Sequence, residues 1–202
     1  LMDKQSKTIF DFIPTQAHSI VAKYIKKYPA RFIISKKRFS KHGDYRFYFN
    51  GFEQISINSN LSPHRFLITL IHEVSHLVAF KVYGKNIRPH GVEWKKIYRD
   101  LMTPLINSYV FPEIIIPVLK KHFINPKASS DSDTKLVIAL DSLENNDKIY
   151  VFNIPEGKYF QIYNGRIFKK GRRLRKRFEC QEKSSNRKYL FSPIAEVECV
   201  LN

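Results

Sequence analysis

The sequence predicts an α+β fold, in which a helix-and-sheet domain precedes a small β-rich domain. In the first part, the β-type runs RFYFN and FEQISIN meet at Asn50-Gly51, a pair that is a strong hairpin signal. An apolar run of helical length follows, from residue 63 to residue 83. From Lys148 onward, short β-type runs alternate with turn residues. These observations together predict the two-part mixed fold.

The remaining elements follow from helix and strand signals along the chain. Residues 14–28 carry apolar side chains at helical spacing, and Pro29 ends that helix. For the long apolar helix, Ser62 is the expected N-cap, Pro63 takes the first helical position and Gly84 ends the helix. The other expected elements are a strand at 31–35, a basic connection at 36–46, a helix from Gly91 to Met102 and a short helix from Pro112 to His122.

The chain changes character after residue 124. Serines and aspartates indicate a linker at 125–133, so we expect one domain at 1–124 and a β-rich domain at 134–202. No stretch approaches the ~18 uncharged apolar residues of a spanning helix, so no membrane segment is expected. The only cysteines are Cys180 and Cys199, which favours a reducing cytoplasm and no disulfide framework.

Positive charge is the strongest bulk property of the chain. Lys and Arg number 35 against 18 acidic residues, which gives a formal net charge of +17. Such an excess predicts an anionic partner, and nucleic acid is the usual one. An anionic membrane is a weaker alternative, because no basic amphipathic helix stands out. We therefore expect a nucleic acid as a partner.

Residues 72–76 read HEVSH and lie inside the long apolar helix. The spacing places His72 and His76 on one helix face, where both imidazoles can bind one zinc ion. Glu73 lies beside them and can act as the general base that takes a proton from the attacking water. The alternative is a buried helix with two core histidines, but a buried Glu without a partner is costly. The motif therefore predicts a single catalytic zinc.

A third zinc ligand is expected downstream of the helix. His90 lies in the loop sequence RPHGVEW, where Pro89 and Gly91 favour a sharp turn. Glu93 is the alternative and would give a site of two His and one Glu. We prefer His90, since Glu93 then begins the next helix, where an acidic side chain suits the helix dipole.

The motif HEVSH, followed by HGVEW at residues 90–94, resembles the SprT-like family, which includes the Spartan protease. The resemblance extends over about residues 15–122. It implies a zincin-like metallopeptidase domain, with the HExxH helix packed on a small sheet. It also implies that proteins bound or crosslinked to DNA are the substrates. With the basic charge, this makes DNA the expected partner, single-stranded DNA included, of a cytoplasmic protein that can associate with the nucleoid. Carried over to this sequence, the zinc ligands are His72, His76 and His90, and the general base is Glu73.

In zincins, an edge strand near the site pairs with the extended substrate. We expect the strand at 52–58 to do this, or else to be an ordinary sheet strand; its central residues are Gln54, Ile55, Ser56 and Ile57. The resemblance leaves the oxyanion donor open among Tyr83, Tyr98 and Tyr109. Many family members carry a C-terminal zinc ribbon with paired CxxC motifs. This chain has a ribbon-like sequence without CxxC, so a second zinc is not expected there.

Two basic clusters are candidate nucleic-acid contacts. On a β-ribbon the larger cluster forms a ridge on both faces, which suits phosphate contacts, and nearby aromatic rings offer stacking surfaces. The alternatives are a solvated charge run and an ordinary aromatic core. The basic residues are Lys36, Lys37, Arg38 and Lys41 in the first cluster, and Lys169, Lys170, Arg172, Arg173, Arg175, Lys176 and Arg177 in the second; the rings are Tyr159, Phe160, Tyr163 and Phe168.

Two rival functions stay open on the sequence alone. The chain could be a non-catalytic nucleic-acid-binding module whose zinc is structural and closed by four protein ligands. It could also be a cytosolic peptidase that has no link to DNA. Glu73 favours the catalytic alternatives, since a purely structural zinc site needs no base.

Overall fold

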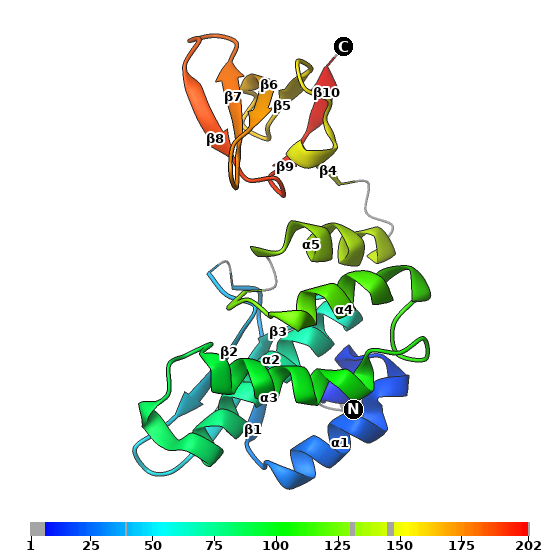
Figure 1. Cartoon of the computed structure of the whole chain (residues 1–202), viewed down its shortest axis with the longest axis vertical. Coiled ribbons are helices and arrows are strands. Elements are labelled where there is room, and N and C mark those ends of the chain that lie inside the picture. Colours follow the sequence, from blue (N-terminus) through cyan, green and yellow to red (C-terminus); the bar gives the residue numbers. More distant parts are fainter. Residues whose placement is uncertain (1–6, 39, 130–131, 145–147, 202) are drawn as a thin grey trace, which may run out of the picture. The chain divides into compact units, whose positions relative to one another are not determined.

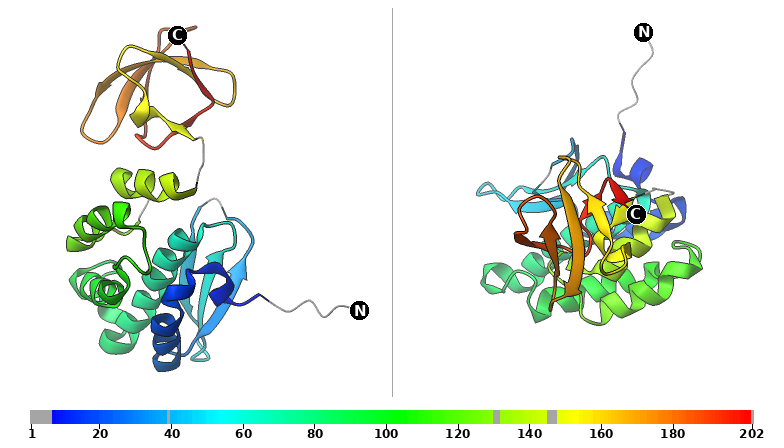
Figure 2. Two further views of the ribbon diagram at one scale, coloured as in Figure 1. Left: turned by 90° about the vertical axis from the view of Figure 1, so that its right-hand side faces the viewer. Right: turned by 90° about the horizontal axis from the view of Figure 1, so that it is seen from above.

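The computed structural model describes residues 7–38, 40–129, 132–144 and 148–201 (Figures 1 and 2). The chain forms two compact units, Leu1–Leu136 and Val137–Asn202. Both helices and strands are present, as an α+β fold requires. The boundary between the units lies inside helix α5 (Thr134–Asp141), a helix that the sequence reading did not anticipate.

The first unit contains a three-stranded sheet and four main helices. Helix α2 packs against strands β2 and β3 and also against α3. Figure 2 shows the strands on one side of α2 and the helices α3 and α4 on the other. The elements are α1 (His18–Lys27), β1 (Arg31–Ser35), β2 (Gly43–Phe47), β3 (Glu53–Asn58), α2 (Pro63–Tyr83), α3 (Val92–Met102) and α4 (Ile116–Ile124).

The sheet has the strand order β1-β3-β2, so β3 lies in the centre. It pairs in parallel with β1 and antiparallel with β2. The prediction that residues 52–58 form an edge strand is therefore wrong. The physical reason is burial: Ile55 and Ile57 are fully buried and Ser56 is 5% exposed, and a strand buried in this way belongs inside a sheet.

Strand β2 is a second correction, since Gly43–Arg46 had been assigned to the basic connection at 36–46. The hairpin between β2 and β3 is confirmed. Gly51 adopts φ 79°, and the Tyr48 N–H donates to the Phe52 carbonyl at 2.8 Å. The charged side chains of Asp44 and Arg46 interrupt the apolar pattern by which a strand is recognised in a sequence. Strand β2 is stabilised by its pairing with β3 rather than by alternating apolar residues.

Helix α2 begins and ends where its sequence signals predict. Pro63 is its first residue, and Gly84 follows its last residue with φ 73°, a backbone conformation that glycine adopts readily. Ser62 occupies the N-cap position, although its hydroxyl makes no capping hydrogen bond. The helix supplies much of the core, including Leu67 and Leu70, both fully buried.

By length and composition alone, the stretch Pro63–Asn86, of 24 residues, could cross a membrane. Of its most apolar window, 67% is buried inside the structure. Packing within the core therefore accounts for the apolar character of this helix.

The second unit is a small antiparallel β structure. Its five-stranded sheet has the order β10-β5-β6-β7-β8, and β4 pairs separately with β9. A bulge interrupts the pairing of β6 with β7 between Lys170 and Arg173. The strands are β4 (Ile149–Tyr150), β5 (Tyr159–Gln161), β6 (Ile167–Arg173), β7 (Phe178–Glu182), β8 (Lys188–Phe191), β9 (Glu196–Val197) and β10 (Cys199–Leu201).

Aromatic side chains form the core of the second unit. Phe160 and Phe168 stack with centroids 5.8 Å apart and are buried, so they cannot stack on bases as the sequence reading suggested. Cys180 is a free, buried core residue. The core comprises Val151, Ile154, Phe160, Phe168, Phe178, Cys180 and Val197.

Lys170 points into this core and is only 5% exposed. Its ammonium donates to the carbonyls of Ile154 and Phe152 and lies 4.2 Å from the centroid of the Phe178 ring. The prediction that Lys170 contacts nucleic acid is therefore wrong. Alternation along β6 turns this side chain inward, while that of its neighbour Lys169 is exposed.

Replacing Lys170 by Met is expected to lower the free energy of unfolding of the second unit by about 2 kcal/mol or more, because two buried carbonyls lose their donor. Urea denaturation read out by hydrogen exchange at the β6 and β7 amides measures this change. Lys169→Met, one residue away and exposed, is the matched control and should change little. Equal denaturation midpoints for both variants would contradict the role of the buried ammonium.

Candidate metal centre

Three histidines meet at one point of the first unit. Helix α2 supplies His72 and His76, one turn apart, and the loop before α3 supplies His90. Their Nε2 atoms lie 3.3 Å (His72 to His76), 3.0 Å (His76 to His90) and 3.1 Å (His72 to His90) apart. His90 adopts φ 60°, an uncommon conformation for a non-glycine residue, and a functional ligand position is one cause of such strain.

The three nitrogens fit a tetrahedral metal ion. With metal–nitrogen bonds of about 2.0–2.1 Å, tetrahedral zinc ligands lie about 3.3–3.4 Å apart. A ring nitrogen of a neutral imidazole either donates or accepts, never both. Three nitrogens that all lie next to one another cannot all form donor–acceptor pairs. At least two of them must both be donors or both be acceptors, which is unfavourable at this distance. A cation bound to all three lone pairs removes that conflict.

The electrostatic environment keeps these histidines neutral, as metal ligands must be. Burial, followed by the neighbouring His76 and His90, lowers the pKa of His72 to about 2. Burial and His90 lower the pKa of His76 to about 4. Burial also lowers the pKa of His90. All three therefore present lone pairs at neutral pH.

Aromatic side chains of α3 fix the orientation of the imidazoles. Trp94, fully buried, lies 4.7 Å from both His72 and His90, measured between ring centroids. Tyr98 lies 5.3 Å from His72, and its hydroxyl donates to the Ile68 carbonyl at 3.2 Å. The Trp of the HGVEW motif therefore packs directly against the cluster.

Glu73 lies beside the cluster and is 6% exposed. Burial raises its pKa to about 8, and the Asp44 carboxylate acts in the same direction. The backbone N–H of Tyr45 donates to the Glu73 carboxylate and opposes this rise. A cation bound at the histidines would also favour the ionised carboxylate. Glu73 is thus a buried acid held near the histidine cluster by strand β2.

A pocket of about 490 Å³ opens at the cluster. It is lined by all three histidines and Glu73, by β2, and by residues near 128. Tyr98 also lines it, whereas Tyr83 and Tyr109 are outside its lining and are 44% and 82% exposed. Of the three candidate oxyanion donors, only Tyr98 is near the pocket, and its hydroxyl already bonds Ile68.

Strand β2 presents the open edge of the sheet to this pocket. The carbonyl of His42 accepts from the Asn58 N–H, and the Tyr48 N–H donates to the Phe52 carbonyl. The backbone N–H and C=O groups of the even-numbered residues therefore form the hydrogen bonds to β3. Pairing alternates along an antiparallel strand, so the backbone groups of Gly43 and Tyr45 face the open edge. The sequence analysis began this strand at Arg46 and so missed Gly43–Tyr45; the glycine in KHGDYR was the one signal that could have indicated them.

The predicted site residues thus separate into two groups. His72, Glu73, His76 and His90 come together, while Glu93 lies outside the histidine cluster. The predicted substrate residues of β3 lie in the sheet centre: Gln54 is half-buried and Ile55, Ser56 and Ile57 are buried.

The residues of the first basic cluster differ in exposure. Lys36 and Lys37 are exposed. Arg38 instead forms an ion pair with Asp44 and donates to Asn58 at 2.7 Å, which corrects its assignment as a phosphate contact. In the second cluster, the side chains other than Lys170 are exposed: Lys169, Arg172, Arg173, Arg175, Lys176 and Arg177.

Comparisons with known proteins agree with this geometry. The model of the SprT-like family matches residues 7–112, just over half of the chain. Protein SprT of Pseudomonas paraeruginosa (strain DSM 24068 / PA7) and that of Pseudomonas aeruginosa (strain LESB58) are each 52% identical over 33 residues, which is 16% of this chain and 20% of theirs. Protein SprT of Pseudomonas fluorescens (strain SBW25) is 47% identical over 40 residues, 20% of this chain and 24% of its own.

These matches therefore span only about a fifth to a quarter of the length of the curated relatives. No solved structure matches the chain. The family match, by contrast, contains both HEVSH and His90. The chain belongs to the SprT-like family.

Proposed function

We propose that this protein is a zinc-dependent endopeptidase. The observation that carries the proposal is the cluster of three Nε2 atoms within 3.0–3.3 Å of one another, beside the buried carboxylate of Glu73. Histidine nitrogens alone suit zinc, and three protein ligands leave a fourth position open, as in catalytic zinc sites. A structural site would instead be closed by a fourth protein ligand, and none joins the histidines among the described residues.

His72, His76 and His90 would hold the zinc ion. When bound, zinc would supply a Lewis acid that polarises the scissile carbonyl and makes water acidic enough to attack at neutral pH. Glu73 accepts the proton of the attacking water and then donates it to the leaving amine. The partly enclosed pocket around Glu73 limits the access of bulk water to this proton.

Strand β2 replaces β3 as the proposed substrate strand. The backbone of Gly43 and the carbonyl of Tyr45 at its open edge can pair with an extended peptide, while the Tyr45 N–H donates to Glu73. Such pairing brings the peptide alongside the pocket that contains Glu73 and the histidines. Main-chain pairing reads no particular side chain, so we expect broad specificity for unfolded or extended segments.

A proteolysis assay with the full chain tests this proposal. Zinc-loaded protein is incubated with a basic DNA-binding protein, such as a linker histone, and with β-casein, and self-cleavage is followed in the same tubes. We expect cleavage that a chelator abolishes and added zinc restores. Zinc bound at one equivalent with no cleavage of any substrate, with or without DNA, would favour the non-catalytic module instead.

We further propose that the protein acts in the cytoplasm on proteins bound or crosslinked to DNA. The net charge of +17 and the exposed basic residues of the second unit support this. Arg175, Lys176 and Arg177 lie at the turn between β6 and β7, where the Leu174 N–H donates to the Arg177 carbonyl at 2.7 Å. A basic hairpin turn suits phosphate contacts without reading bases.

Replacing Arg175, Lys176 and Arg177 together by Gln is expected to weaken binding to a single-stranded oligonucleotide. Each lost phosphate contact should reduce the slope of log Kobs against log salt by about 0.7. Fluorescence anisotropy over a salt series measures both quantities. Lys23, Lys26 and Lys27 of α1, replaced in the same way, remove equal charge from exposed positions. Equal weakening by both triple variants would indicate diffuse attraction, and unchanged binding would remove the turn from the interface.

A further inference from the structure

Strand β2 contacts α2 through every second residue. Its alternation turns Gly43, Tyr45 and Phe47 toward the helix. Phe47 packs on Phe80 with centroids 4.6 Å apart, and Tyr45 packs on the same ring at 6.3 Å. One end of the strand is thus held to α2 by aromatic contacts, while the other end carries a glycine next to the metal centre.

At Gly43 the strand comes closest to the helix. A Cβ atom built on Gly43 would lie 2.8 Å from Cγ2 of Thr69, 3.0 Å from Cγ of Glu73 and 3.1 Å from Oε1 of Glu73. Gly43 does not adopt a positive φ, so its backbone conformation does not require glycine. The close approach to Thr69 and Glu73 is therefore the physical reason for a glycine here.

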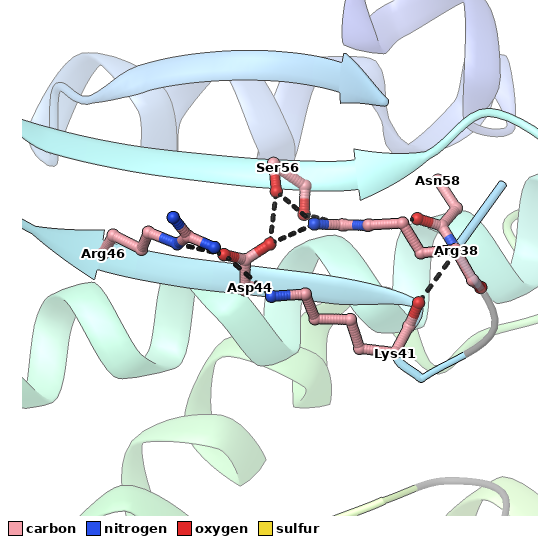
Figure 3. A network of polar contacts seen from close by, with 6 residues as sticks. All are labelled: Arg38, Lys41, Asp44, Arg46, Ser56 and Asn58. Carbon is pink, nitrogen blue, oxygen red and sulfur yellow. Dashed lines mark hydrogen bonds and ion pairs between the residues drawn. The ribbon is translucent and has the colours of Figure 1, made fainter. Parts of the chain in front are cut away.

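The opposite face of β2 is anchored to β3 by a polar network centred on Asp44 (Figure 3). Asp44 accepts from the Ser56 hydroxyl and from Arg38, and its other oxygen pairs with Arg46 at 2.7 Å. Although burial acts to raise it, these hydrogen bonds hold the pKa of Asp44 well below its usual range. Asp44 is therefore a fixed anion that ties the strand to its neighbour.

The same network fixes the chain that leads into β2. The side-chain amide of Asn58 donates to the carbonyls of Arg38 at 3.1 Å and Lys41 at 2.8 Å. Arg38 in turn donates to Asn58 and Ser56 (Figure 3). Strand β2 is paired with β3, and the Phe80 ring packs on the rings of Tyr45 and Phe47. Gly43 and the N–H of Tyr45 therefore have little freedom to move away from Glu73.

We propose that Gly43 and the Tyr45 backbone N–H position the Glu73 carboxylate for proton transfer, so that the substrate-pairing strand also orients the general base. This inference rests on the proposed peptidase function. Because Gly43 has no side chain, the Glu73 side chain can lie directly against the strand. The Tyr45 N–H then holds the Glu73 carboxylate in that conformation by a hydrogen bond. Neither touches the metal, so they act through Glu73 alone.

The test compares Thr69→Ser with the double variant Gly43→Ala, Thr69→Ser in the full, zinc-loaded chain. Ser at position 69 lacks Cγ2 and so removes the 2.8 Å contact, which protects the fold, while the contacts to Glu73 remain. The new methyl group faces α2 and not the open edge, so peptide pairing is preserved. We expect the double variant to keep its melting temperature, zinc content and KM, and to lose kcat by about 10- to 100-fold.

Crystal structures of both zinc-loaded variants give a readout that does not depend on activity. We expect the Glu73 carboxylate to leave the Tyr45 N–H in the double variant. An unmoved Glu73, or a kcat equal to that of Thr69→Ser, would overturn the proposal. If the wild-type protein itself cleaves nothing, the peptidase function fails, and the crystal structures alone decide whether Gly43 positions Glu73.

Discussion

Replacing Glu73 by Gln is expected to lower kcat by about 10²- to 10⁴-fold while leaving the zinc content unchanged. Gln has nearly the same shape as Glu but cannot accept the proton of the attacking water. The three histidines proposed as zinc ligands are not altered, and their nitrogens, 3.0–3.3 Å apart in the structure, should keep their positions. Cleavage rates under substrate saturation, with zinc measured by atomic absorption, test the expectation.

Glu113→Gln is the matched control for this experiment. It makes the same chemical change at an exposed position ahead of α4, outside the lining of the pocket. Its activity should equal that of the wild type. If Glu73→Gln retained full activity with zinc bound, the general base would have to be another group and the proposed mechanism would be wrong. Loss of zinc from Glu73→Gln would instead indicate that Glu73 helps to hold the metal.

Replacing His90 by Ala is expected to abolish tight zinc binding and the thermal stabilisation that zinc gives. With zinc present at a thousand times its Kd, the wild-type protein should gain about 4 kcal/mol in free energy of unfolding. The variant retains only the pair on α2, His72 and His76, which offers two of the three ligands. Melting temperatures with and without zinc, together with zinc content after dialysis, measure both effects.

His18→Gln serves as the control for this second prediction, because His18 lies at the start of α1 and outside the cluster. It should show the same zinc-dependent shift as the wild type. Glu93→Ala tests the alternative third ligand. A variant lacking His90 that still bound zinc tightly, alongside a Glu93→Ala variant that did not, would show that Glu93 completes the site.

The sequence predicted what depends on local signals. Pro63 and Gly84 bounded the central helix, because capping and backbone preferences act within one turn. The spacing of His72 and His76 placed both on one face, and the turn around His90 was visible in its flanking Pro and Gly. His90 was preferred to Glu93 as the third ligand on the sequence alone, and the family resemblance supported that choice.

The missed features depend on neighbours that are distant in sequence. The sequence of β3 identifies it as a strand, but not its position in the sheet. Its central position between β1 and β2 depends on strands that are distant in sequence. Strand β2 was hidden because its Asp44 is paired with Arg38, Arg46 and Lys41, partners that the fold brings together. Lys170 was misread because its orientation depends on how β6 lies in the folded sheet, where alternation places it on the same face as the buried Phe168.

The open edge of β2 also has a cost for the protein itself. An unpaired strand edge is a template for any extended chain, including the same strand of a second molecule. A second copy paired at this edge would occupy the position proposed for the substrate peptide, so self-association would compete with substrate binding. The strand limits this risk because it is only five residues long and alternates Asp44 and Arg46 with its smaller and aromatic residues. The proposed peptidase, which would accept extended chains, thus has to remain poor at accepting its own strand.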